Sequence, residues 1–203
     1  MRHMVLRYRR ILVALGALSA GLIAWPTVGA AQSVTGVATA VRATTSGLFG
    51  STTTELAGTG TLSDSTDARE ASQITGQVPS LLTGETLHAT TIGWPDQAAA
   101  EASLARLALS VAGTRIGADS VLARAVAASD GAGYAVSNID GLTINGVPIA
   151  VSGEPNQTLS IPGGLLVINE QQTSGSTSVV NALHVTLDGV ADVVIASATA
   201  AIQ

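Results

Sequence analysis

The chain of 203 residues contains no cysteine and no lysine, and these two absences exclude several kinds of chemistry. Without cysteine there is no disulfide, no thiolate nucleophile and no thiolate metal ligand. Without lysine there is no phosphate-binding loop of the Gly-rich, Lys-containing type. All nine basic residues are arginines, too few to form a phosphate-binding surface on an acidic chain. We therefore expect no thiol-dependent enzyme and no nucleic-acid partner.

Aromatic residues make up only 2% of the chain. Beyond residue 30 they are Phe49, Trp94 and Tyr134. Three aromatic side chains do not build an extended platform for sugar rings. Trp94, in the segment IGWPDQ, is a binding candidate for a small carbohydrate site; the alternative is that it plugs one end of the fold.

The N-terminal residues predict a secretory signal peptide over 1–30. The basic segment MRHMVLRYRR precedes the apolar run ILVALGALSAGLIAW, and small residues follow in PTVGAAQ. This order is typical of a cleaved leader. We expect cleavage before Ala31, with cleavage before Gln32 as the alternative. A single membrane anchor is less favoured because the apolar run is short for a span of about 20 residues. Arg9-Arg10 alone is a weak signal for twin-arginine export.

Cleavage changes the charge of the protein. All fourteen acidic residues and only five of the arginines lie beyond residue 30, which gives residues 31–203 a formal net charge of −9. An acidic surface favours solubility and opposes binding to anionic membranes. We expect an extracellular or cell-surface protein with no transmembrane segment after cleavage. The sequence leaves the anchoring route open.

Residues 31–203 predict one all-β domain. Short stretches rich in Val, Thr and Ala alternate with Asn-Gly and Asp-Gly dipeptides, which supply the positive backbone angles of tight hairpins. This pattern is typical of an antiparallel two-layer β-sandwich of about nine or ten strands. The dipeptides are Asp130-Gly131, Asp140-Gly141, Asn145-Gly146 and Asp188-Gly189.

The segment 97–112 allows two interpretations. Its many alanines favour a helix near 97–110, because alanine is the best helix former. The alternation of Leu107, Leu109 and Val111 with Arg106 and Ser110 equally fits a strand.

The segment GGLLVINEQQTSGSTSVVNALHV, residues 163–185, predicts a hairpin with polar residues inside its strands. With a loop centred on Gly175, Asn169 faces Asn181. Two facing amides satisfy one another in a core, so we predict a structural role for this pair in fixing the register. Glu170 and His184 lie on the opposite face as candidate binding residues, near enough for diagonal contact only.

Catalytic and metal motifs are sparse. Beyond residue 30 the only histidines are His88 and His184, and there is no G-x-S-x-G elbow to pair with them. Asp64, Asp67 and Glu70 are weak calcium candidates, since their spacing of three differs from the alternating ligands of a calcium loop. We expect no enzyme, no cofactor and no metal ion.

Several segments resemble the choice-of-anchor P family of secreted bacterial proteins. They run from LALSVAGTRIGADSVLARAVA through GLTINGVPI, PNQTLSIPGG and LLVINEQ to VNALHVTLDG and DVVIASATA, over roughly residues 100–200. The resemblance implies an extracellular β-rich domain without an established activity, and it favours strands in the ambiguous middle. The expected function is a non-enzymatic structural or interaction protein, whose partners are other copies or components of the cell envelope or matrix. The alternatives are a carbohydrate- or calcium-dependent binding module and, least favoured, a secreted hydrolase.

Overall fold

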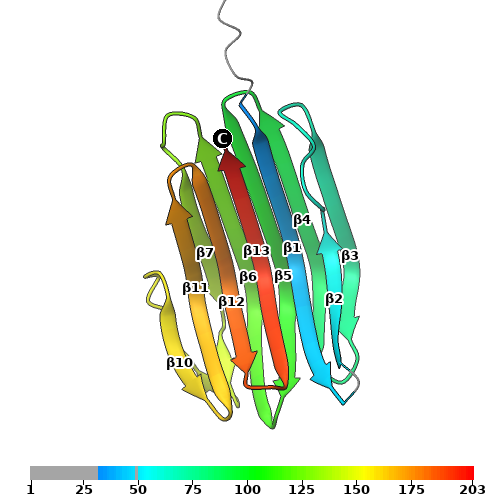
Figure 1. Cartoon of the computed structure of the whole chain (residues 1–203). Coiled ribbons are helices and arrows are strands. Elements are labelled where there is room, and N and C mark those ends of the chain that lie inside the picture. Colours follow the sequence, from blue (N-terminus) through cyan, green and yellow to red (C-terminus); the bar gives the residue numbers. More distant parts are fainter. Residues whose placement is uncertain (1–31, 49) are drawn as a thin grey trace, which may run out of the picture. The chain divides into compact units, whose positions relative to one another are not determined.

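In the described part of the chain, two antiparallel sheets stacked face to face contain thirteen strands (Figure 1). This computed structural model describes residues 32–48 and 50–203, and no helix occurs in them. Sheet A holds, in spatial order, β10 (Gln157–Ile161), β11 (Gly164–Ser174), β12 (Thr177–Leu187), β13 (Ala191–Ile202), β1 (Val34–Gly47) and β2 (Gly50–Gly58). Sheet B holds β3 (Ala68–Val78), β4 (Leu82–Trp94), β5 (Gln97–Val111), β6 (Thr114–Ala128), β8 (Thr143–Ile144) and β9 (Val147–Pro148), with β7 (Tyr134–Asp140) beside β6.

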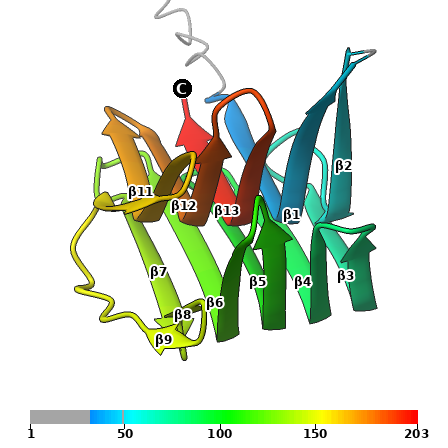
Figure 2. The ribbon, with the colours of Figure 1, turned by 90° about the horizontal axis from the view of Figure 1, so that it is seen from below.

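The predicted all-β two-layer sandwich is confirmed, and Figure 2 shows the two layers end-on. The strand count exceeds the nine or ten expected, partly because β8 and β9 have two residues each. Residues 32–203 form one compact unit, whereas the predicted signal peptide over 1–30 lies outside the described residues. In the described part of the chain no helix is long and apolar enough to span a membrane.

The segment Gln97–Val111 is a strand, so the helical alternative near 97–110 is wrong. Its inward residues Ala98, Ala100, Ala102 and Leu104 are at most 2% exposed and pack in the core between the sheets. β5 lies between β4 and β6 along nearly its whole length. Burial on one face and pairing on both edges outweigh the weak helix preference of alanine.

The first and last strands of the described chain are neighbours. β1 pairs with β13 from Val34↔Ile202 to Thr45↔Ala191. Two further backbone bonds join Ser33 and Gln203, at 2.7 and 2.9 Å. β1 and β13 are both interior strands of sheet A, and their pairing joins β2 on one side to β10–β12 on the other.

At one row of residues that crosses sheet A, the inward and outward alternation of each long strand is interrupted. Along β1, the inward residues run through Ala38 and Ala40 and continue with Val41 and Ala43, so two consecutive residues point inward. The same doubling occurs across β2, β11, β12 and β13, where the pairing register passes over one residue in each strand. We name this set the buried row: Asn169, Ala182, Ala196, Ala40 and Ala57.

Three residues of the buried row have a left-handed backbone. The φ angles are 54° at Asn169, 50° at Ala196 and 48° at Ala57, on alternate strands of the sheet. A left-handed residue breaks the two-residue repeat of a strand and lets successive side chains share a face. In β12 the odd-numbered residues therefore do not all share one face. Leu183 and Val185 point inward, whereas Asn181 is on the outer face.

Sheet B is interrupted by a similar row, but there the extra residue of each strand points away from the core. We name its residues the exposed row: Ile74, Thr86, Arg106, Asp119 and Gly141. Three of them, Thr86, Arg106 and Gly141, have positive φ angles of 51°, 50° and 66°. Outward in sheet B and inward in sheet A are the same direction in space. Both layers thus carry their extra residue on the same side, and they bend together instead of separating.

The hairpin of β11 and β12 has a register one residue away from the expected one. Glu170, not Asn169, faces Asn181. The predicted amide pair between Asn169 and Asn181 is therefore wrong. Asn169 is buried alone, where its Nδ2 donates to the carbonyl of Gly153 at 3.0 Å and its Oδ1 accepts from Gln171 Nε2 at 2.8 Å. Asn169 is thus structural, but it ties the loop before β10 rather than the neighbouring strand.

Candidate functional site

A polar cluster on the outer face of sheet A joins β11, β12 and β13. Glu170 is directly opposite Asn181, and Thr186 is directly opposite Asp192. His184 lies between these two pairs along β12. The odd-numbered Asn181 and the even-numbered His184 share one face only because the buried row reverses the strand between them. We name Glu170, Asn181, His184, Thr186 and Asp192 the imidazole cluster.

The imidazole ring of His184 contacts a carboxylate on each side. Its Nδ1 is 2.9 Å from Glu170 Oε2, and its Nε2 is 3.0 Å from Asp192 Oδ2. The amide Nδ2 of Asn181 donates to the same Glu170 oxygen at 2.7 Å. The predicted diagonal contact of Glu170 with His184 is therefore a hydrogen bond. Each ring nitrogen of His184 therefore lies within hydrogen-bond distance of a carboxylate oxygen.

This geometry differs from that of a hydrolytic triad. A general base needs a free nitrogen lone pair directed at the nucleophile. Thr186 Oγ1 lies 3.4 Å from His184 Nε2, but the carboxylate of Asp192 is nearer to the same nitrogen. Among the described residues, the second histidine, His88, approaches Glu70 at 3.5 Å. The imidazole cluster therefore ties three strands together, with one carboxylate at each ring nitrogen of His184.

A polar hollow of about 420 Å³ adjoins the imidazole cluster. Asn156, Gln171, Gln172 and Val179 line it together with Glu170, Asn181 and His184. The Oδ1 atom of Asn181 is buried there without a hydrogen-bond partner. The side chains of His184 and Glu170 are 20% and 34% exposed, so water screens their charges in part.

Trp94 lies far from the imidazole cluster in the pairing pattern, at the end of β4 in sheet B. It is 40% exposed, and it is outside the core, so the expectation that it plugs one end of the fold is wrong. Close by on the outer face, Ile92, Ala99, Val126 and Tyr134 form one cross-strand row.

This apolar row lines a second hollow, of about 280 Å³. An ion pair borders it, in which Arg124 Nε donates to Glu101 Oε2 at 2.6 Å. The hydrogen bond that Arg124 donates to Glu101 raises the pKa of Arg124 above its usual value. Sequence reasoning noted Tyr134 but did not assign it to a site. Its position opposite Val126 depends on the register of β6 with β7, which the turn dipeptide Asp130-Gly131 does not specify.

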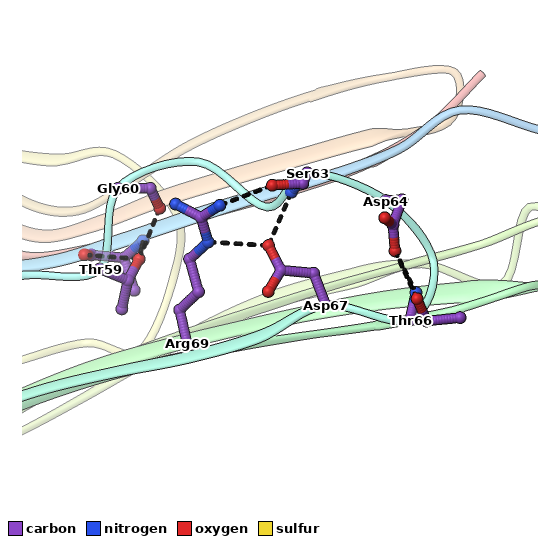
Figure 3. Close-up of polar contacts among 8 residues, drawn as sticks. Thr59, Gly60, Ser63, Asp64, Thr66, Asp67 and Arg69 are labelled. Carbon is purple, nitrogen blue, oxygen red and sulfur yellow. Dashed lines mark hydrogen bonds and ion pairs between the residues drawn. The ribbon is translucent and has the colours of Figure 1, made fainter.

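The weak calcium candidates Asp64 and Asp67 belong to the loop that crosses from β2 to β3 (Figure 3). Asp67 accepts from the Ser63 amide and from Arg69 Nε, both at 2.8 Å. Asp64 accepts from the amide and the hydroxyl of Thr66, both at 2.7 Å. These hydrogen bonds lower the pKa of both carboxyls.

The crossing loop covers the core between β2 and β3 on one side of the sandwich. Leu62 is 4% exposed and packs in the core, and the bonds around Ser63 and Asp67 hold it there. Glu70, the third candidate, is on β3 and approaches His88 instead. Within residues 32–48 and 50–203, no three acidic or histidine side chains gather in a way that would hold a metal ion.

Comparison of the chain with family models, with curated proteins and with solved structures finds no match.

Proposed function

We propose that the protein is an exported, non-enzymatic structural or interaction module of the cell surface or extracellular space. The observation that carries this proposal is the open edge of β2, which carries four consecutive Ser and Thr residues and one charged residue, Glu55. The leader-like N-terminus and the resemblance to the choice-of-anchor P family support export and a role outside the cell. The imidazole cluster supports the non-enzymatic part, because its carboxylates occupy both ring nitrogens.

The mode of interaction is strand addition. An open edge presents a row of unpaired backbone N–H and C=O groups, and an extended partner strand satisfies them. In such an interface the backbone provides the affinity, and the alternating side chains provide the selectivity.

Fractionation of the producing cell tests this proposal. A tagged chain is expected in the envelope or the medium, and Thr53→Pro on β2 is expected to move it from the envelope to the medium. Thr158→Pro on β10, at the other edge of sheet A, is the matched control and should leave the distribution unchanged. Accumulation of the unmodified chain in the cytoplasm would contradict the proposal.

A second candidate function is binding of a small carbohydrate at the hollow beside Tyr134. The observation that favours it is the combination of an exposed aromatic ring with Gln97 and the Glu101–Arg124 pair around one apolar floor. A glycan array is the test. Binding that is lost in Tyr134→Ala and retained in Thr53→Pro would support this candidate, whereas an array without signal would reject it.

A further inference from the structure

The open edges of the two sheets differ in their protection against pairing. Proteins protect edge strands with proline, charge or short length. β10 has five residues and lies between Pro155 and Pro162, and β9 contains Pro148. β3 carries Arg69 and Glu70. β7 has seven residues, and its inward side packs in the core through Ile139.

β2 has little of this protection. It has nine residues, no proline and one charged residue, Glu55. Its residues from Gly50 to Thr53 are exposed on both faces. Figure 2 shows the hairpin of β1 and β2 curling away from sheet B at its tip. A partner strand therefore reaches this edge without meeting the other layer.

The hydrogen bonds of β1 show which backbone groups of β2 are free. The Ser46 amide donates to Val190 O at 2.9 Å, on the β13 side of β1. Ser46 is directly opposite Ser51, so Ser46 and Ser51 are a non-hydrogen-bonded pair of the β1–β2 ladder. Backbone direction alternates along an antiparallel strand. Ser51, Thr53 and Glu55 therefore direct their N–H and C=O groups to the open edge.

We infer that this edge binds a second copy of the chain, with the two β2 strands antiparallel about a two-fold axis at Thr53. This inference rests on the proposed function and names its partner. The segment Ser51–Glu55 reads Ser-Thr-Thr-Thr-Glu, and the axis places Thr53 opposite its own copy and Ser51 opposite Glu55. Three pairs of this kind exchange about six backbone hydrogen bonds.

The side chains fit this symmetry. The two Glu55 carboxylates face serines instead of one another, and Arg42 lies opposite Glu55 within the same chain. The central threonines are β-branched and suit a strand. The contact is small, since a stable interface usually buries more than about 1,000 Å². The dimer is therefore weak, and it strengthens with salt, which screens the repulsion between two acidic chains.

A chain without cysteine allows a direct test by cross-linking. Hydrogen-bonded antiparallel partners have Cα atoms about 5.5 Å apart, within disulfide range. On oxidation, Thr53→Cys is expected to give a covalent dimer. Thr158→Cys, an exposed position on β10, is the matched control and should remain monomeric. Equal cross-linking of the two variants would overturn the inference.

Light scattering of the unmodified protein over a concentration series gives an independent measurement. A concentration-dependent dimer is expected, and Thr53→Pro should weaken it about tenfold or more, because proline removes a donor and distorts the edge. A thermal melt checks that this variant is folded. A strict monomer at millimolar concentration would overturn the inference. If Thr53→Pro nevertheless releases that monomer from the envelope, the proposed function stands with a different partner.

Discussion

The buried row of sheet A and the exposed row of sheet B use the same backbone device with different residues. Both rows break the two-residue repeat, and both contain left-handed residues with φ near 50°. The buried row consists of four alanines and one asparagine, whereas the exposed row includes isoleucine, arginine and aspartate. The difference shows that the reversal itself tolerates many side chains. Burial between the sheets restricts the inward version to small residues and to Asn169, whose amide is satisfied by hydrogen bonds.

The largest expected effect comes from enlarging the buried row. Ala196 has no exposed surface and a φ of 50°. Ala196→Val adds two methyl groups to a close-packed core and places a β-branched residue in the left-handed region. Together these changes should lower the free energy of unfolding by about 3 kcal/mol or more. Urea denaturation is the measurement.

Arg106→Val is the matched control, since Arg106 has the same φ of 50° but is exposed. It carries the backbone strain without the packing clash and should cost about 1 kcal/mol. Equal losses of stability in the two variants would show that backbone strain accounts for the loss and that burial does not distinguish the two rows.

The next effect concerns the polar member of the buried row. Asn169→Ala removes the bonds to Gly153 and Gln171 and leaves their polar groups without a partner. It also places alanine in a conformation that asparagine tolerates better, and the total cost should be about 2 kcal/mol. Asn169→Gly removes the same bonds and relieves the backbone. If the glycine variant regains most of the stability lost in the alanine variant, the hydrogen bonds are not the main contribution of this residue.

A smaller effect is expected at the imidazole cluster, which exists because of the reversal. His184→Gln breaks the contacts to Glu170 and Asp192 and should cost about 1 kcal/mol, as partly exposed ion pairs do. His88→Gln in sheet B is the comparison. His88 has one distant carboxylate, at 3.5 Å, and its replacement should change the stability by less than about 0.5 kcal/mol. Thermal melts of both variants are the measurement, and equal stability losses would show that the contacts of His184 in sheet A do not stabilise the fold.

The smallest effect, with the opposite sign, is expected in the exposed row. Arg106→Gly relieves a left-handed conformation at the cost of backbone entropy, and should raise the free energy of unfolding by about 0.5 kcal/mol. Ala108→Gly, on the same strand with a negative φ, should lower it by a similar amount. A loss of stability in Arg106→Gly would mean that the left-handed residue is not strained.

The fold class could be predicted from the sequence because it depends on local signals such as turn dipeptides. Asn145-Gly146 and Asp188-Gly189 lie at hairpin turns between β8 and β9 and between β12 and β13, as expected from turn chemistry. The two reversals had no such signal. Glycine or asparagine indicates a left-handed residue, but Ala196, Ala57, Thr86 and Arg106 do not.

Local signals also limit how much of the candidate site can be predicted from the sequence. Glu170 and His184 were assigned to one face, and they meet there. The contact of Asp192 with His184 was not predicted, because the Asp188-Gly189 dipeptide indicates a turn but leaves the register of β12 with β13 open. The register of the β11–β12 hairpin was wrong by one residue, because a symmetric loop about Gly175 was assumed.

The pairing of β1 with β13 has a consequence for how the chain reaches its folded state. β1 is the first strand of the described chain, and it pairs along most of its length with the last. Sheet A is incomplete until residues near Ile202 are available, so the β1–β13 pair forms across almost the whole length of the described chain. Contacts of such long separation fold slowly. A partly synthesised chain therefore leaves the apolar side of β1 exposed and unfinished, and refolding after dilution from urea should be limited by the return of its own C-terminal strand.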